Sequence, residues 1–282
     1  RIYRSISIKR NAKIKKEKRE NMAIGIFDSG VGGLTVLKEV RKVLPNEQIY
    51  YFGDTARVPY GDKSKELIIR YSKQIVEFLL EKKVDAIVVA CNTATSLALE
   101  ELNETFKTPI IGVIDAGVKT ALYTTKTNKI GIIGTAATIG SEKYEIEIKK
   151  IRINSEVYSK ACPLFVPAVE EGIISGKLVK QIVKLYLDEL ENKIDTIILG
   201  CTHYPLLKDT INELYSNIKV VDPARETAHD LKEILIKEQL MKNDAEKGKE
   251  VQYFVTDGSD KFKEIGTMFL GEKIEFVEAV KL

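Results

Sequence analysis

The chain has 282 residues, of which 44% are hydrophobic and 30% are charged, and its formal net charge is +3. This length is typical of about two domains with substantial cores, and no apolar run reaches the roughly 18 to 20 residues of a membrane span. The N-terminus also lacks the apolar stretch of a secretory signal. Three cysteines without a C-x-x-C spacing exclude a disulfide scaffold, so we expect a reducing, cytoplasmic compartment. Because no apolar run is long enough to span a membrane, we expect no membrane partner.

The positive charge is concentrated in the first 21 residues. Residues 1–21 hold nine basic and two acidic side chains, net +7, whereas residues 22–282 hold 35 basic and 39 acidic side chains, net −4. We expect this basic leader to be an upstream extension outside the fold, with a nucleic-acid-binding arm and an organellar presequence as the alternatives. The mildly acidic remainder gives no reason to expect nucleic-acid binding.

Short apolar runs alternate with longer amphipathic stretches along the rest of the chain. The runs predict strands at 23–27, 48–53, 84–90, 109–114, 129–133, 156–159, 194–200, 218–221 and 251–255. Most are continuously apolar, which is typical of parallel strands covered on both faces. Residues 64–83, preceded by Ser64 as N-cap, and residues 177–190 carry apolar side chains at helical spacing. This alternation predicts an α/β fold.

The chain also contains an internal repeat. Residues 84–93 and 194–203 align without a gap at an offset of 110, and each segment has an acidic residue, an apolar run and then a cysteine. Residues 24–30 correspond in the same way to 130–135, and residues 113–115 to 220–222. The repeat predicts two pseudo-symmetric α/β lobes with central, mostly parallel sheets.

We expect the first lobe to comprise 22–115 plus 224–282 and the second lobe 116–223. The segment 224–282 has no evident counterpart and is expected to pack back onto one lobe. Ligands of such folds bind at the carboxyl ends of the strands, so the active site is predicted in the cleft between the lobes.

The two repeated cysteines, Cys91 and Cys201, are the leading candidates for chemistry. Each follows a strand and precedes polar residues that can start a helix, where backbone amides favour the thiolate. Packing as small hydrophobic residues, a redox disulfide and a metal site with His203 are the alternatives. An extended Cys201-x-His203 segment would point the two side chains apart, so no metal is expected. Two facing thiols indicate acid/base chemistry on two faces of one substrate.

A glycine-rich stretch follows the first strand. It reads Asp28-Ser29-Gly30-Val31-Gly32-Gly33, and Thr35 interrupts the G-x-G-x-x-G spacing of a dinucleotide site. We expect its glycines to let backbone amides approach a small anion such as a carboxylate, and Asp28 to contact a substrate ammonium or cap a helix. The Tyr60-Gly61 turn presents amides to a ligand or is a plain surface turn. No G-x-S-x-G motif occurs, and His229 falls in an exposed helix, so a serine hydrolase is not supported.

Four motifs together resemble the bacterial glutamate racemases, over essentially all of residues 22–282. They are Phe27-Asp28-Ser29-Gly30-Val31-Gly32-Gly33-Leu34-Thr35, Gly53-Asp54-Thr55-Ala56-Arg57-Val58-Pro59-Tyr60-Gly61, Ala90-Cys91-Asn92-Thr93-Ala94 and Gly200-Cys201-Thr202-His203-Tyr204-Pro205-Leu206. The related aspartate racemases generally carry an acidic residue where this chain has His203. The resemblance implies interconversion of L- and D-glutamate without a cofactor, supplying D-glutamate for peptidoglycan, with Cys91 and Cys201 as the two bases.

The resemblance also implies roles for further residues. Asp28 and His203 would assist the two cysteines as catalytic residues, and Asp54 and Glu170 would lie near the site, unless Asp54 simply holds the turn before Tyr60. From its place before Pro163, Cys162 is expected to pack rather than to act in catalysis. The substrate-binding positions would be Asp28, Ser29, Tyr60, Gly61, Asn92, Thr93, Thr138, Thr202 and His203. A homodimer is expected, and its geometry and any regulation by a cell-wall precursor stay open. The alternatives are a sister racemase acting on aspartate and a non-catalytic amino-acid-binding module.

Overall fold

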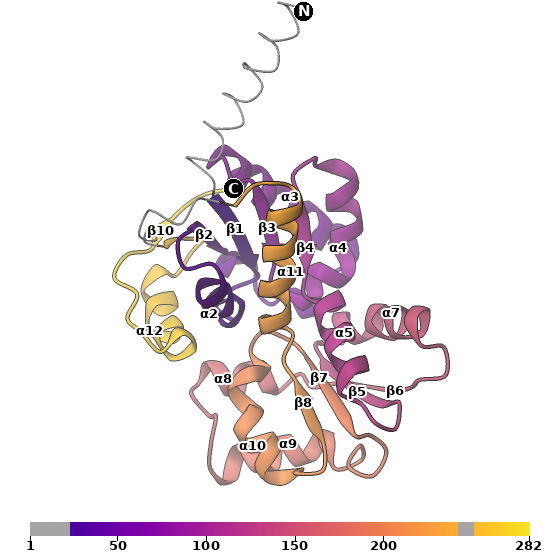
Figure 1. Ribbon diagram of the computed structural model, residues 1–282. Helices are drawn as coiled ribbons and strands as arrows, with labels where there is room; N and C mark the ends of the chain where they lie inside the picture. The colour runs from indigo at the N-terminus through magenta and orange to yellow at the C-terminus, as the bar shows by residue number, and fades with distance from the viewer. Residues whose placement is uncertain (1–22, 242–250) are drawn as a thin grey trace, which may run out of the picture.

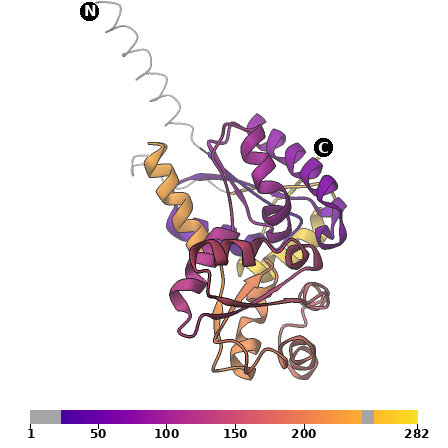
Figure 2. The same cartoon turned by 90° about the vertical axis from the view of Figure 1, so that its right-hand side faces the viewer.

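The computed structural model describes residues 23–241 and 251–282 and contains two parallel β-sheets, each flanked by helices (Figures 1 and 2). The basic leader, residues 1–21, lies outside the described residues. The six-stranded sheet has the order β10-β9-β2-β1-β3-β4, and the four-stranded sheet has the order β6-β5-β7-β8. The strands are β1 Ala23–Asp28, β2 Gln48–Gly53, β3 Ala86–Val89, β4 Ile110–Gly112, β5 Lys129–Gly134, β6 Glu156–Ala161, β7 Thr196–Gly200, β8 Lys219–Val221, β9 Gln252–Val255 and β10 Glu278–Ala279.

Helices cover both faces of each sheet, which explains the continuously apolar strands. The helices are α2 Leu34–Val43, α3 Lys65–Glu81, α4 Asn92–Thr105, α5 Ile114–Thr124, α6 Ala136–Gly140, α7 Lys143–Ile151, α8 Phe165–Glu170, α9 Lys177–Leu187, α10 Lys208–Leu214, α11 Ala224–Lys237 and α12 Ser259–Leu270, with 3-10 turns η1 Thr55–Arg57, η2 Tyr60–Asp62 and η3 Tyr204–Leu207. None of these helices is long and apolar enough to cross a bilayer. The predicted α/β class with parallel sheets is therefore confirmed.

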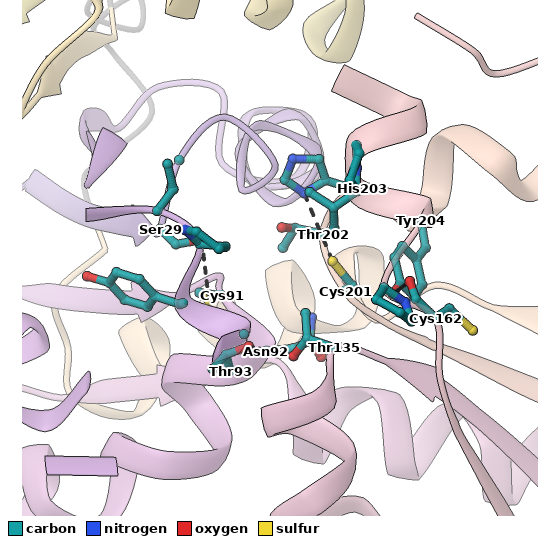
Figure 3. Close-up of a pocket in the computed structure, with 18 of the residues that line it drawn as sticks. Ser29, Cys91, Asn92, Thr93, Thr135, Cys162, Cys201, Thr202, His203 and Tyr204 are labelled. Atoms are coloured by element: carbon teal, nitrogen blue, oxygen red, sulfur yellow. Dashed lines mark hydrogen bonds between the residues drawn. The ribbon is translucent and has the colours of Figure 1, made fainter. Parts of the chain in front are cut away.

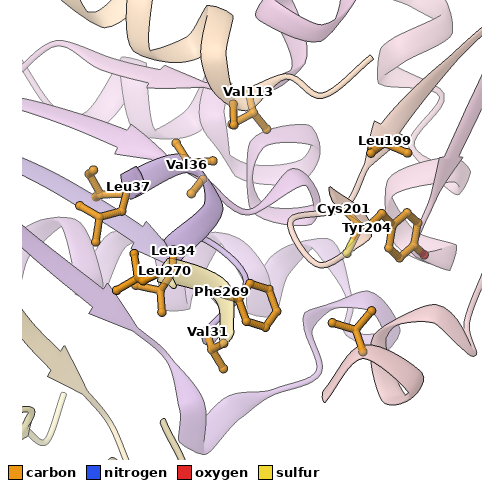
Figure 4. Packing of buried hydrophobic residues seen from close by; sticks show 14 of the residues in the cluster. Val31, Leu34, Val36, Leu37, Val113, Leu199, Cys201, Tyr204, Phe269 and Leu270 are labelled. Carbon is orange, nitrogen blue, oxygen red and sulfur yellow. The ribbon is translucent and has the colours of Figure 1, made fainter. Parts of the chain in front are cut away.

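Alternate side chains of each strand pack on opposite faces. In the six-stranded sheet, Phe27 and Val89 face α3 and α4, whereas Ile26 and Val88 face α2, α11 and α12. In the four-stranded sheet, α5 and α7 pack on one face and α8, α9 and α10 on the other. One buried cluster runs from Leu34 of α2 across to the end of β7, so the two sheets share a core (Figure 4).

The predicted repeat is visible in the pairing of the strands. Ile24 of β1 pairs with Ala86 of β3, and the equivalent residues Ile130 of β5 and Thr196 of β7 pair in the same register. The correspondences of β1 with β5 and of β3 with β7 are therefore confirmed. The repeat brings the carboxyl ends of β3 and β7 to equivalent positions in the two sheets.

The third predicted correspondence is wrong by three residues. Ile110 pairs with Ile87 in the first sheet and Val220 pairs with Ile197 in the second, so the counterpart of Val220 is Ile110 rather than Val113. The strand also ends at Gly112 instead of 114, and α5 begins at Ile114. The apolar run continues unbroken from the strand into the buried face of the helix, so hydrophobicity alone does not mark this boundary.

Two helices cross between the sheets. Helix α5 follows β4 of the six-stranded sheet but packs on β7, β8 and α7, whereas α11 follows β8 of the four-stranded sheet but packs on α2 and α5. The Lys119 Nζ of α5 lies 3.0 Å from both carboxylate oxygens of Asp230 of α11. Helix α11 is therefore the counterpart of α5, and the segment that lacks a counterpart begins only after α11. The boundaries proposed for the two lobes stay a prediction.

Candidate active site

A cavity of about 380 Å³ opens at the carboxyl ends of strands from both sheets (Figure 3). It is lined by Ser29, Gly30, Val58, Pro59, Tyr60, Gly61, Asp62, Cys91, Asn92, Thr93, Thr135, Ala136, Cys162, Pro163, Val166, Pro167, Glu170, Glu171, Gly200, Cys201, Thr202, His203 and Tyr204. Of the predicted residues, Asp28, Asp54 and Thr138 do not line it. The two repeated cysteines enter the cavity from different sheets, after β3 and after β7.

Cys91 is the N-cap of α4 and is only 6% exposed. Its Sγ accepts from the amide of Ala94 at 3.5 Å, and its thiol donates to Ser29 Oγ at 3.8 Å. Burial nevertheless raises the pKa of Cys91 to about 12, because desolvation and the nearby Asp28 outweigh these hydrogen bonds. The amide at the helix N-terminus therefore favours the thiolate, as expected, but burial and the charge of Asp28 act against it more strongly.

Cys201 is equally buried, and burial raises its pKa as well. The chain turns directly after β7, since the amide of Tyr204 donates to the carbonyl of Cys201 at 3.1 Å. Cys201 Sγ and His203 Nδ1 consequently lie 4.0 Å apart (Figure 3). The assumption of an extended segment with diverging side chains is thus wrong. Within residues 23–241 and 251–282, no three His, Cys, Asp or Glu side chains are arranged to hold a metal ion.

His203 is held on its other side by Glu170. The two side chains meet at 3.0 Å between Nε2 and Oε1, and the hydrogen bond from His203 lowers the pKa of Glu170. Phe269 of α12 packs edge-on against the imidazole, with ring centroids 5.3 Å apart. The imidazole is therefore fixed between a carboxylate and an aromatic ring, with Nδ1 toward Cys201.

Asp28 lies behind the cavity wall and is fully buried. Its carboxylate accepts from the Gly30 amide at 3.0 Å and from Thr202 Oγ1 at 3.3 Å, while the N-cap residue of α2 is Gly33. Burial raises the pKa of Asp28, although the nearby His203 acts in the opposite direction. Its predicted contact with substrate stays a prediction, and its observed contacts connect the first sheet to the Thr202 segment of the second.

Gly32 lies where the two halves of the site meet most closely. A Cβ at this position would come within 2.3 Å of Thr202 Oγ1 and 2.5 Å of His203 Nδ1. Atoms at such distances overlap, so only glycine fits here without displacing the Thr202-His203 segment. Close packing between the two halves therefore requires glycine at this position, and the expected approach of a small anion to the backbone amides stays a prediction.

Three threonine hydroxyls join α4 to α6 beside the cavity. Thr93 Oγ1 lies 2.9 Å from Thr135 Oγ1 and 3.2 Å from Thr138 Oγ1. Thr138 sits behind the lining, whereas Thr135 lines the cavity and was missed by the sequence analysis. The repeat could have revealed it, because Thr135 occupies the position after β5 that Ser29 occupies after β1.

Asn92 and Tyr60 are both anchored from outside the cavity. Asn92 Oδ1 accepts from the Tyr144 hydroxyl at 2.7 Å, and the Tyr60 hydroxyl donates to Asp54. Tyr60 therefore presents its ring and backbone to the cavity while its hydroxyl points away. Cys162 also lines the cavity, although it is fully buried and its thiol donates to the Lys160 carbonyl at 3.7 Å.

A family model described as "Asp/Glu/Hydantoin racemase" matches residues 34–231. The chain belongs to this family. Among curated proteins, it is 52% identical to the glutamate racemase of Aquifex aeolicus over 90% of this chain and 96% of that protein, and 51% identical to the glutamate racemase of Persephonella marina over 90% and 95%. The expected resemblance is confirmed, and the racemase is an isomerase.

Solved structures of racemases share its architecture. The glutamate racemase of Francisella tularensis in complex with D-glutamate superposes with a TM-score of 0.86 at 41% identity, covering 93% of this chain and 98% of that one. Glutamate racemase RacE1 of Bacillus anthracis gives a TM-score of 0.88 at 40% identity with the same coverage. The two-sheet fold is therefore the fold of this family.

The raised pKa of Cys91 in this racemase predicts an unusual pH dependence of alkylation. Because only the thiolate reacts, the rate at Cys91 should rise about tenfold per pH unit from pH 7 to 10 without levelling off, given a pKa of about 12. Mass spectrometry of the Cys91 peptide after timed exposure to iodoacetamide measures the rate. A free cysteine peptide in the same tube serves as the control and should level off above about pH 8.5. A plateau of the Cys91 rate near that pH would contradict the prediction.

Proposed function

We propose that this racemase interconverts L- and D-glutamate without a cofactor, using Cys91 and Cys201 as its two acid/base groups. One observation carries the proposal: thiols at equivalent ends of two repeated strands line a single cavity. The names of its relatives support glutamate as substrate, and the Francisella structure holds D-glutamate.

Inversion at the α-carbon requires removal of a proton from one face and delivery of a proton to the other. In the proposed scheme one cysteine takes the α-proton as thiolate while the opposite cysteine donates its thiol proton, and the roles exchange for the reverse reaction. Burial raises the pKa of both thiols, and the positive charge of the substrate ammonium favours the thiolate in one of them, whose proton is released to solvent. A thiolate with a raised pKa is in turn a stronger base toward the weakly acidic α-proton.

The carboxylates of the substrate would be held by neutral donors. The residues found to line the cavity include no Lys or Arg, but they include hydroxyl and amide side chains and the first turn of α4. Amides at a helix N-terminus bind anions, and fixed dipoles stabilise the negative charge that develops at the α-carbon. We assign substrate binding to Ser29, Tyr60, Gly61, Asn92, Thr93, Thr202 and His203, with Asp28 and Thr138 behind them.

The surroundings of the two bases differ, because only Cys201 has an imidazole beside it. Replacing Glu170 with Gln should lower kcat/KM by about tenfold, since the amide is neutral and a hydrogen bond to a charged group contributes roughly 1.5 to 3 kcal/mol. Glu171→Gln is the matched control, because the neighbouring carboxylate also borders the cavity, whereas it is Glu170 Oε1 that lies 3.0 Å from His203 Nε2. Initial rates from each enantiomer, measured by circular dichroism, test this, and equal rates for both variants would refute it.

Deuterium exchange tests the proposed reaction directly. The protein is incubated with L-glutamate in deuterated water, and NMR follows the α-proton while circular dichroism follows optical activity. A thiol carries one proton, so a two-base enzyme should form D-glutamate labelled with solvent deuterium while the remaining L-glutamate keeps its α-proton early in the reaction. Early label in both enantiomers would indicate a single base and would overturn the scheme.

Two further outcomes would redirect the assignment. Exchange with aspartate but not with glutamate would identify the sister racemase, and exchange with neither would favour a non-catalytic amino-acid-binding module.

We place the enzyme in the cytoplasm as a homodimer that supplies D-glutamate for peptidoglycan. Its physiological role is tested by depletion in the cell of origin. Growth should then depend on added D-glutamate, and growth without it would contradict this role.

A further inference from the structure

The C-terminal segment that follows α11 adds strands to only one of the two sheets. Strand β9 pairs with β2, so Val255 lies beside Gly53 at the carboxyl edge of the six-stranded sheet. The segments that follow β2 and β9 stay hydrogen-bonded beyond the last paired residues of the two strands. The Thr256 amide donates to the Gly53 carbonyl at 3.3 Å, and the Asp257 amide donates to Thr55 Oγ1 at 3.0 Å. The four-stranded sheet, by contrast, is formed by β5 to β8 alone.

One side chain of this segment reaches toward the cavity wall. Thr256 Oγ1 accepts from the Ala56 amide at 2.8 Å and donates to Asp54 Oδ1 at 3.0 Å. A hydroxyl can do both at once, whereas a methyl group can do neither. Asp54 is fully buried, and its other contacts are the Arg57 Nε at 2.7 Å and the Tyr60 hydroxyl. A chain of hydrogen bonds thus runs from the C-terminal segment to the cavity.

We infer that Thr256 is a positioning residue for the reaction, acting through Asp54 and Ala56 on the Tyr60-Gly61 wall of the cavity. This inference rests on the proposed function. Gly61 packs directly against Thr135, which also lines the cavity, since a Cβ on Gly61 would come within 2.9 Å of Thr135 Cβ. A small shift of Tyr60-Gly61 therefore alters the space available to the substrate. Cys91 and Cys201 instead follow β3 and β7, so such a shift affects substrate binding more than proton transfer.

Replacing Thr256 with Val keeps the shape of the side chain and removes both hydrogen bonds. We expect KM to rise about tenfold, because this is the size of effect that the loss of a hydrogen bond to a charged group produces. The value of kcat should change less than about threefold. Thr256→Ser keeps the hydroxyl and should restore the wild-type KM. Thr267→Val is the matched control, because Thr267 on α12 is exposed and its hydroxyl only donates to the Lys263 carbonyl.

A double-mutant cycle separates positioning from general stability. Tyr60→Phe removes the other hydroxyl that donates to Asp54, so its effect on KM and that of Thr256→Val should be markedly less than additive. Thermal unfolding of each variant is recorded alongside. Additive effects, a KM unchanged in Thr256→Val, or an equal rise in Thr256→Ser would overturn the inference. Absence of racemisation in the wild-type protein would instead overturn the proposed function, so the two failures are distinguishable.

Discussion

Replacing either Cys91 or Cys201 with Ala is expected to lower kcat/KM for glutamate racemisation by at least about a thousandfold in both directions. Each direction needs one thiolate and one thiol on opposite faces of the α-carbon, and one positioned acid or base alone typically contributes 10²- to 10⁴-fold. The measurement is the initial rate of each variant from L- and from D-glutamate by circular dichroism.

The third cysteine provides the control for this experiment. Cys162 is buried and lines the same cavity, but it follows β6 rather than β3 or β7. Cys162→Ala should therefore keep its activity within about tenfold of the wild type, because an internal Ala loses packing without losing a base. Full activity of Cys201→Ala would refute the two-base scheme, and so would a loss in Cys162→Ala as large as in the other two variants.

Gly32→Ala is expected to reduce kcat/KM by about a hundredfold. Its new methyl group would overlap Thr202 Oγ1 and the His203 ring, so the segment beside Cys201 must move. A displacement of about 1 Å in a catalytic group can cost this much, and overpacking also destabilises a protein by about 1 to 3 kcal/mol. We therefore expect a melting temperature lower by several degrees, measured by thermal unfolding alongside the kinetics.

Gly140→Ala is the matched substitution, because a Cβ at the end of α6 meets no atom within 4 Å. It should leave both the melting temperature and kcat/KM close to those of the wild type. Wild-type values of both quantities in Gly32→Ala would show that the two halves of the site are not in close contact in solution.

The strands could be predicted from the sequence because they are short, apolar and buried on both faces. The repeated segments have almost the same spacing in sequence, and in the structure β1 pairs with β3 in the same register as β5 pairs with β7. The boundary near Gly112 could not be predicted, since buried strand and buried helix are equally apolar there. Strand β10, with two exposed residues, carries no apolar signal at all.

The residues of the site were likewise predictable from the sequence only in part. Cys91 and Cys201 were identified because each thiol stands at the end of a repeated strand. Their protonation could not be predicted, because a motif shows the helix amides but not the depth of burial that opposes them. The approach of His203 to Cys201 depends on a turn that an alternating pattern does not reveal. Thr256 is about 200 residues from its partners in sequence, a separation that no local pattern spans.

Helices α5 and α11 each pack against elements from the other half of the chain. The apolar side of α5, with Ile114 and Val118, is covered by strands that come later in the sequence, and α11 covers a helix that comes earlier. Neither half closes its own core. A polypeptide of half this length would have to lend its last helix to a second copy and borrow one in return, as in a domain-swapped dimer. In this single chain α5 and α11 have the arrangement that the swapped helices of such a dimer would have.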